Sequence, residues 1–198
     1  MKLFIAALFS VFATMALATV DGFPALYDVT DVAADDSLNV RETPNAGSIV
    51  VSSFPPTAKN IEVVALNDAE TWGLVNIDGR SGWVSMRYMA RHPGQYAGNV
   101  PNLTYCHGTE PFWGLEFMDG KVSFSSPENT GAMIPFTALR SANRIDRFAI
   151  VASGMTGVVI EQRCSDGMSD FTYGLAVEML APLYGEMQLL SGCCTIQP

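Results

Sequence analysis

Basic residues and histidine are scarce in this chain of 198 residues. Lysine and arginine together number 11 against 20 acidic residues, which gives a formal net charge of −9 at pH 7. Proteins that bind nucleic acid usually present a basic surface, and proteins attracted to anionic lipid usually carry a polybasic cluster. The composition therefore argues against both classes, and we expect no nucleic acid among the partners.

Motifs that identify several common enzyme classes are also missing. The sequence has no glycine-rich phosphate loop with its lysine, no G-x-S-x-G and no H-E-x-x-H. Because His92 and His107 are the only histidines, most histidine-based metal sites and triads lack the residues they need. We expect no cofactor and no metal, and we expect that the protein is not an enzyme.

The first 18 residues, MKLFIAALFSVFATMALA, form the longest apolar run. The charge at Lys2, the apolar stretch and the small-x-small site ending at Ala18 are typical of a secretory signal peptide. The competing interpretation, a membrane anchor, requires about 20 apolar residues, and Asp21 ends the run too early. We expect cleavage after Ala18, a periplasmic or secreted location, and no stable membrane insertion after cleavage.

All four cysteines lie in the second half of the chain. An even number of cysteines in an exported protein favours two disulfides. Because adjacent residues of a strand face opposite ways, Cys193 and Cys194 should reach different partners. We favour the pairs Cys164–Cys193 and Cys106–Cys194. A zinc site is the alternative, although the spacing lacks the paired cysteines of structural zinc sites.

Short β-rich runs separated by Gly, Asp, Asn and Pro dominate the remaining sequence, and no long helical periodicity appears. The stretch HPGQYAGNVPN, residues 92–102, has the composition of a linker. We divide the chain into a signal peptide (1–18), a module at 24–91, this linker, and a second module at 103–198. The pattern predicts an all-β protein, with a small barrel followed by a disulfide-bonded antiparallel β-barrel.

Individual strands can be placed by their alternation and by the turns between them. In the first module they are expected near residues 36–44, 49–54, 61–66, 72–77 and 80–85. The last two flank Asp78-Gly79, a hairpin turn in which glycine supplies a positive φ. In the second module we expect a hairpin at 112–125 and runs at 145–152, 158–164, 175–180 and 187–190. A short helical turn is expected within residues 136–143.

The first module carries an ordered set of motifs: LNVR at residues 38–41 with Pro44, then Trp72, then GWV at 82–84 with Tyr88. With these motifs, residues 25–90 resemble the bacterial SH3-like domain, although Met89 stands where leucine is usual. The resemblance implies a small β-barrel that binds cell-wall peptides or accompanies envelope enzymes. Candidate contact residues around a shallow groove are Trp72, Trp83 and Tyr88. Burial of the two tryptophans in the barrel core is the alternative.

The second module carries GTEPFW at residues 108–113, CSDGMS at 164–169 with Tyr173, and Gly192-Cys193. Most of 103–198 therefore resembles a family of small exported bacterial proteins that share GTEPFW and C-x-D-x-M-S signatures. That family includes lipoproteins, but this chain lacks the lipoprotein cysteine, and the resemblance implies no activity. The candidate binding surface consists of Glu110, Phe112, Trp113, Asp166 and Ser169.

Two of these residues, Glu110 and Asp166, are carboxylates within the motifs. If the disulfides draw the two segments together, the pair could transfer protons or hold a cation. The structural alternative is an Asx-type turn at Asp166 and a loop cap at Glu110.

Together these observations predict an exported, non-enzymatic binding or docking protein of the bacterial cell envelope, with peptidoglycan or an envelope protein as partner. One alternative is a cell-wall hydrolase or transpeptidase, because HGT at 107–109 and SGC at 191–193 resemble motifs of L,D-transpeptidases. The long separation of the two motifs, and the missing arginine after the cysteine, count against it. Another alternative is an inhibitor of a secreted enzyme such as lysozyme, which would present residues 165–169.

Overall fold

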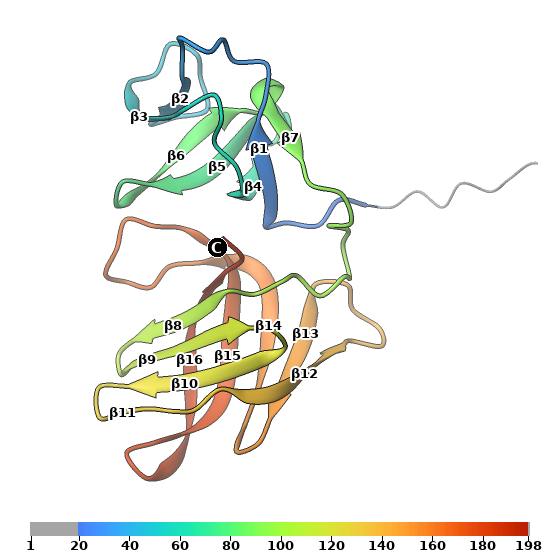
Figure 1. Cartoon of the computed structure of the whole chain (residues 1–198), viewed down its shortest axis with the longest axis vertical. Helices are drawn as coiled ribbons and strands as arrows, with labels where there is room; N and C mark the ends of the chain where they lie inside the picture. Colours follow the sequence, from blue (N-terminus) through green and yellow to red (C-terminus); the bar gives the residue numbers. More distant parts are fainter. Residues whose placement is uncertain (1–19, 198) are drawn as a thin grey trace, which may run out of the picture.

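The computed structural model describes residues 20–197, which form two antiparallel β-sheets, one above the other in Figure 1. The expected signal peptide, residues 1–18, lies outside this range. Within residues 20–197 the structure contains one short 3-10 helix and no helix that is long and apolar enough to cross a membrane. The described chain is therefore all-β, as the sequence predicts.

The first sheet has seven strands in the order β3-β2-β6-β5-β4-β1-β7. In chain order they are β1 (Ala25–Val29), β2 (Leu38–Arg41), β3 (Val50–Phe54), β4 (Ile61–Leu66), β5 (Trp72–Ile77), β6 (Arg80–Ser85) and β7 (Met89–Arg91). The five expected strands are β2 to β6. The turn between β5 and β6 has positive φ at both Asp78 and Gly79, as a two-residue hairpin requires.

A single core fills the first sheet. It includes Val40, Val63, Val75 and Val84, which lie on four different strands and are almost fully buried. Tyr27 joins them from β1, a strand that was not expected from the sequence. The sheet therefore wraps around one small core, and it stays open because β3 and β7, at its two edges, do not pair with each other.

The second sheet has nine strands in the order β11-β10-β12-β13-β14-β15-β16-β8-β9. In chain order they are β8 (Tyr105–Thr109), β9 (Phe112–Met118), β10 (Lys121–Ser126), β11 (Asn129–Thr130), β12 (Ile134–Arg140), β13 (Arg147–Ala152), β14 (Met155–Cys164), β15 (Tyr173–Leu183) and β16 (Glu186–Thr195). Because β10 also pairs with β9, eight of the strands close into an antiparallel barrel. A closed barrel of this kind is the predicted architecture.

One local prediction is wrong. Residues 136–143, expected to contain a helical turn, lie mostly in β12. This strand pairs with β13 from Phe136 opposite Ala152 to Arg140 opposite Phe148. Without β12 the backbone groups of β13 would face a gap in the barrel wall, so long-range pairing overrides the local preference of the segment.

The two disulfides have the expected pairing. Cys106 of β8 is bonded to Cys194 of β16, directly opposite it in the sheet with a Cα–Cα distance of 4.0 Å. Cys193 is bonded to Cys164 at the end of β14, with a Cα–Cα distance of 5.7 Å. Since Cys193 and Cys194 are adjacent on β16, their side chains leave the strand on opposite faces, and only Cys194 belongs to the barrel core.

The C-terminal end of the barrel sheet is joined to the first module through Glu62 of β4. This glutamate is only 4% exposed. Its Oε2 accepts hydrogen bonds from the Thr195 hydroxyl and from the backbone amides of Ile196 (3.0 Å) and Gln197 (3.2 Å). Its Oε1 is buried and has no partner among the described residues. Burial raises the pKa of Glu62 above its usual value of 4.5, and the three hydrogen bonds only partly oppose the rise.

The buried carboxylate makes stability depend on pH. Because the pKa of Glu62 is higher in the folded chain, its contribution to stability is largest below the unfolded pKa and falls as the pH rises through the folded pKa. A Glu62→Gln variant removes this charge, so we expect it to be more stable than the wild type at pH 8, by about 1–3 kcal/mol. The difference should shrink towards pH 4.

Urea unfolding at both pH values measures this effect. The matched control is Glu70→Gln, which changes an exposed glutamate on the β4–β5 loop and should leave stability unchanged. A variant that is less stable than the wild type at pH 8 would contradict the argument, because the charge of Glu62 would then be stabilising.

Candidate functional site

A second contact between the modules joins the β5–β6 hairpin to the segment that precedes β15. The side-chain amide of Asn76 donates to the carbonyl oxygen of Thr172 (2.9 Å), and the amide of Thr172 donates to the Ser81 hydroxyl (2.8 Å). The amide of Ser81 donates to the carbonyl oxygen of Asp170 (3.0 Å). With the Glu62 contact, these bonds hold the two modules together at two separate places.

A cleft of about 1000 Å³ lies between the modules. This volume is at the upper end of the range of small-ligand sites, about 300–1,000 Å³. Six of its lining residues are phenylalanine, tyrosine or tryptophan: Phe54, Tyr105, Phe112, Trp113, Phe171 and Tyr173. No lysine or arginine lines the cleft among the described residues, and its one lining carboxylate is Asp78. The cleft is therefore largely apolar, with acidic rather than basic charge.

A continuous row of rings crosses the barrel side of the cleft. Tyr105 stacks on His107 with a centroid distance of 5.6 Å, and His107 meets Tyr173 edge to face at 5.1 Å. Tyr173 in turn meets Phe171 edge to face at 6.2 Å. Tyr105 and His107 are two residues apart on β8, so the alternation of the strand puts both rings on one face. Aromatic pairs of this geometry stabilise the row.

Trp113 forms the inner part of the cleft and is 4% exposed. Its indole stacks on Phe124 at 6.4 Å. A side chain at Gly108 or Gly192 would collide with this indole and with neighbouring backbone. Both glycines are therefore required for β8 and β16 to pack against Trp113, which explains why glycine opens the GTEPFW motif and precedes Cys193.

Asp166 lies behind the row of rings and is the most heavily bonded carboxylate of the site. It accepts from the amides of Ser169 (2.8 Å) and Met168 (3.0 Å), from the Ser169 hydroxyl (2.8 Å) and from His107 Nε2 (3.4 Å). Burial opposes ionisation of Asp166, but these hydrogen bonds together outweigh it and hold its pKa well below the usual range. The Asx-type turn expected at Asp166 is present, because its Oδ1 accepts the amides two and three residues ahead.

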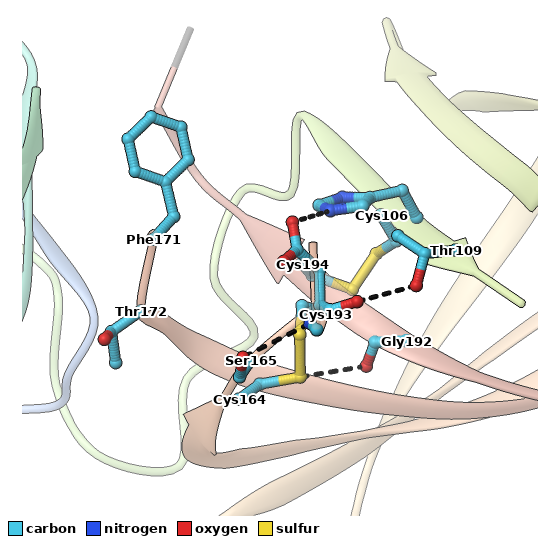
Figure 2. Close-up of a disulfide and its surroundings, with 12 residues drawn as sticks. Cys106, Thr109, Cys164, Ser165, Phe171, Thr172, Gly192, Cys193 and Cys194 are labelled. Carbon is cyan, nitrogen blue, oxygen red and sulfur yellow. Dashed lines mark hydrogen bonds and ion pairs between the residues drawn. A yellow bond between two sulfur atoms is a disulfide. The ribbon is translucent and has the colours of Figure 1, made fainter. Parts of the chain in front are cut away.

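The disulfides fix the segments that carry these side chains. Cys106 precedes His107, and Cys164 precedes the turn that holds Asp166. Figure 2 shows the two disulfides next to each other, with the hydrogen bond of Thr109 beside them. In that bond the Thr109 hydroxyl donates to the carbonyl oxygen of Asp166 (2.6 Å). The HGT and CSDGMS segments, far apart in the sequence, are thereby joined at the cleft.

The arrangement of His107 differs from that of a catalytic base. In a triad, one ring nitrogen faces a carboxylate and the other faces the nucleophile or substrate. Here Nε2 faces Asp166, while Nδ1 is buried within the protein and has no partner among the described residues. The Ser169 hydroxyl donates to Asp166 rather than to His107. His107 therefore has the position of a wall residue of the cleft.

The cysteines are all consumed in disulfides. This removes the zinc site considered as an alternative, and it leaves Cys193 without the free thiol that transpeptidase chemistry needs. Among residues 20–197 no group of three or more His, Cys, Asp or Glu side chains is placed to hold a metal ion.

The candidate residues of the second module fall into three groups. Phe112 and Trp113 line the cleft, with Phe112 53% exposed. Asp166 and Ser169 lie directly behind its wall and bond to each other. Glu110 is exposed in the β8–β9 turn and is not among the lining residues, and no hydrogen bond joins its carboxylate to Asp166 among residues 20–197.

The candidate residues of the first module lie elsewhere. Trp72 and Trp83 are half-buried and outside the core cluster, because they occupy the face of the β5–β6 hairpin opposite to Val75 and Val84. The alternative that both tryptophans form the barrel core is therefore wrong. Tyr88 packs against the core cluster instead. None of the three residues lines the inter-module cleft.

Several cleft residues were not identified from the sequence. Phe54, Asn76 and Asp78 reach the cleft only because the modules dock, and no local signal marks them. Tyr105 was detectable, since it lies two residues before His107 on β8, and the i, i+2 spacing of a strand puts both rings on one face.

The ionised carboxylate of Asp166 should stabilise the folded chain at neutral pH. Because its pKa is lowered in the folded chain, this contribution is present above the unfolded pKa, near 3.8, and is lost as the pH falls through the folded pKa. We expect Asp166→Asn to lower the free energy of unfolding at pH 7 by about 1–3 kcal/mol, with a smaller loss at pH 3.

Urea unfolding of Asp166→Asn is compared with Asp68→Asn, which changes an exposed carboxylate on the β4–β5 loop. The control should unfold like the wild type at both pH values. An equal loss at pH 7 and pH 3 for Asp166→Asn would mean that the lost hydrogen-bond acceptor, and not the charge, matters.

Comparison of the chain with models of known protein families, with curated proteins and with solved structures finds no match. The two resemblances read from the motifs therefore stay predictions.

Proposed function

We propose that the protein is an exported, non-enzymatic docking protein of the bacterial cell envelope and that its ligand binds in the cleft between the two modules. The observation that carries the proposal is the cleft itself, which is large, lined with aromatic side chains and built by both modules. Apolar clefts with a few polar groups are the usual form of ligand sites. The two contacts between the modules make the cleft a feature of the whole chain.

Export is supported by two independent features. The first 18 residues have the composition of a signal peptide. Both disulfides link segments distant in sequence, and such bonds persist in oxidising compartments such as the bacterial periplasm. The resemblance of the first module to SH3-like domains, and of the second to small exported proteins, favours the envelope as the place of action.

A binding role fits the cleft better than catalysis does. The buried Nδ1 of His107 cannot reach a substrate, and Cys193 is bonded to Cys164. A cell-wall transpeptidase or hydrolase would need a nucleophile or a pair of carboxylates at the cleft surface. Among the described residues, Asp78 is the one carboxylate that lines it.

The role of an enzyme inhibitor is less well supported. Such a protein would insert a projecting loop into the cleft of lysozyme or another secreted enzyme. The segment considered for this role, residues 165–169, is tied down by the hydrogen bonds to Asp166, and its Met168 lines the protein's own cleft.

Co-sedimentation with cell envelopes isolated from the bacterium that makes the protein tests the proposal. We expect the chain from Thr19 to Pro198 to sediment saturably with the envelopes. Phe112→Ala should weaken this binding at least about tenfold, because truncation of an aromatic contact residue removes the side chains that dominate binding energy. Circular dichroism and thermal unfolding of the variant check that the fold is unchanged.

Two control variants locate the binding surface. Leu189→Ala removes an exposed apolar side chain of β16, which is outside the cleft lining, and should bind like the wild type. Trp83→Ala tests the groove implied by the SH3-like resemblance. Loss of binding in Trp83→Ala with normal binding in Phe112→Ala would move the site to the first module alone and overturn the proposal, as would an absence of envelope binding by the wild type.

A further inference from the structure

An unprotected edge strand leads into the cleft. Strand β3, with the sequence VVSSF, is at one end of the first sheet, and no strand among residues 20–197 pairs with its outer edge. Natural edge strands are usually blocked by charge, proline or a covering segment, because their free backbone groups pair readily with another chain. β3 has neither charge nor proline within it, and Ile49 and Val50 at its start are exposed.

The direction of β3 connects this free edge to the cleft. Phe54, its last residue, lines the cleft together with Asn76, Ile77 and Asp78 of the neighbouring hairpin. The Ser52 hydroxyl donates to Asp78 Oδ2 at 2.5 Å, so the carboxylate lies beside the strand. A segment that paired with the outer edge of β3 and extended past Phe54 would reach the cleft that Phe54 and Asp78 line.

The charged side chain that lines the cleft is acidic. Asp78 is the lining carboxylate, the cleft has no lining lysine or arginine among the described residues, and the chain as a whole carries a net charge of −9. Aromatic faces attract ammonium and guanidinium groups, and a carboxylate near them adds to the attraction. An acidic ligand would be repelled on approach, and a basic one would be steered towards the cleft.

From these observations we infer that the ligand of the cleft is an extended polypeptide segment, which adds a strand to the free edge of β3 and places a lysine or arginine side chain beside Asp78 and the aromatic wall. The inference rests on the proposed function, since it names the class of ligand for the same cleft. Backbone pairing with β3 supplies affinity, and the cleft supplies specificity for the basic side chain.

Selection from a displayed library of random linear peptides of about eight residues, long enough to cover an edge strand, tests this inference on the chain from Thr19 to Pro198. We expect the enriched peptides to alternate β-branched or aromatic residues with polar ones and to share a lysine or arginine. Enrichment of acidic or proline-rich peptides, or no enrichment at all, would overturn the inference.

Backbone pairing is tested on the best peptide made synthetically. N-methylation of alternate amides removes the donors of one edge while every side chain is kept. One of the two alternating sets should weaken binding at least about tenfold, and the other should have little effect, because only one edge of the peptide faces β3. Equal affinity of both methylated peptides and the parent would mean that no strand is added.

The position of the basic side chain is tested with a double-mutant cycle. Asp78→Asn should weaken the lysine peptide about tenfold and should not affect the same peptide with norleucine in place of lysine. Asp119→Asn is the matched control, because Asp119 is likewise exposed, has a positive φ and precedes glycine in a hairpin turn. Equal effects of Asp78→Asn on both peptides would contradict the assignment of Asp78.

The envelope experiment separates this inference from the proposed function. Protease treatment of the envelopes removes a polypeptide partner and leaves peptidoglycan in place. Cleft-dependent binding that survives the treatment would assign the cleft to cell-wall peptide, so that the docking function stands and the polypeptide inference fails. If Phe112→Ala leaves envelope binding intact, the proposed function itself fails, whatever the peptides show.

Discussion

The adjacent cysteines of β16 are the constraint on which the site depends. Because neighbouring side chains of a strand leave it on opposite faces, Cys194 closes the barrel towards β8 inside the core, and Cys193 holds the end of β14 from the outside. The Cys193-Cys194 dipeptide thus attaches two segments to β16: the one that follows Cys106 and the one that follows Cys164. His107 directly follows Cys106, and Asp166 lies two residues after Cys164. The two disulfides therefore hold His107 and Asp166 close enough to make contact.

The cleft also depends on the docking of the modules, and here the buried glutamate is central. Glu62 offers one carboxylate oxygen to three donors at the C-terminal end of the chain, at the cost of burying a charge whose second oxygen has no partner within residues 20–197. Such an arrangement is specific rather than strongly stabilising, because desolvation offsets much of the hydrogen bonding. It defines where the C-terminal residues lie, and two of them, Thr195 and Gln197, line the cleft.

The sequence predicted the all-β class, most strands and the disulfide pairing, because these follow from local alternation, turn residues and the two faces of a strand. It failed at residues 136–143, where the need of β13 for a partner decides the conformation. Phe112, Trp113, Asp166 and Ser169 were singled out by their motifs, and all four lie in the cleft wall or directly behind it. The tryptophans of the first module were singled out in the same way and lie outside the cleft, because the hairpin meets the other module at its turn end, through Asn76 and Ser81, and a motif does not specify which part of a hairpin makes that contact.

What the sequence alone determined is the set of parts: two β-modules, four cysteines that bond in pairs, an acidic chain, and aromatic residues gathered in short motifs. These properties depend on residue type and on spacing within a strand. Only the tertiary structure decided that Phe54 and Asp78 of one module line the same cleft as Tyr105 and Phe171 of the other, and that β3, which ends at Phe54, is an edge strand of its sheet. Those relations arise from contacts between residues far apart in the chain, which local periodicity does not encode.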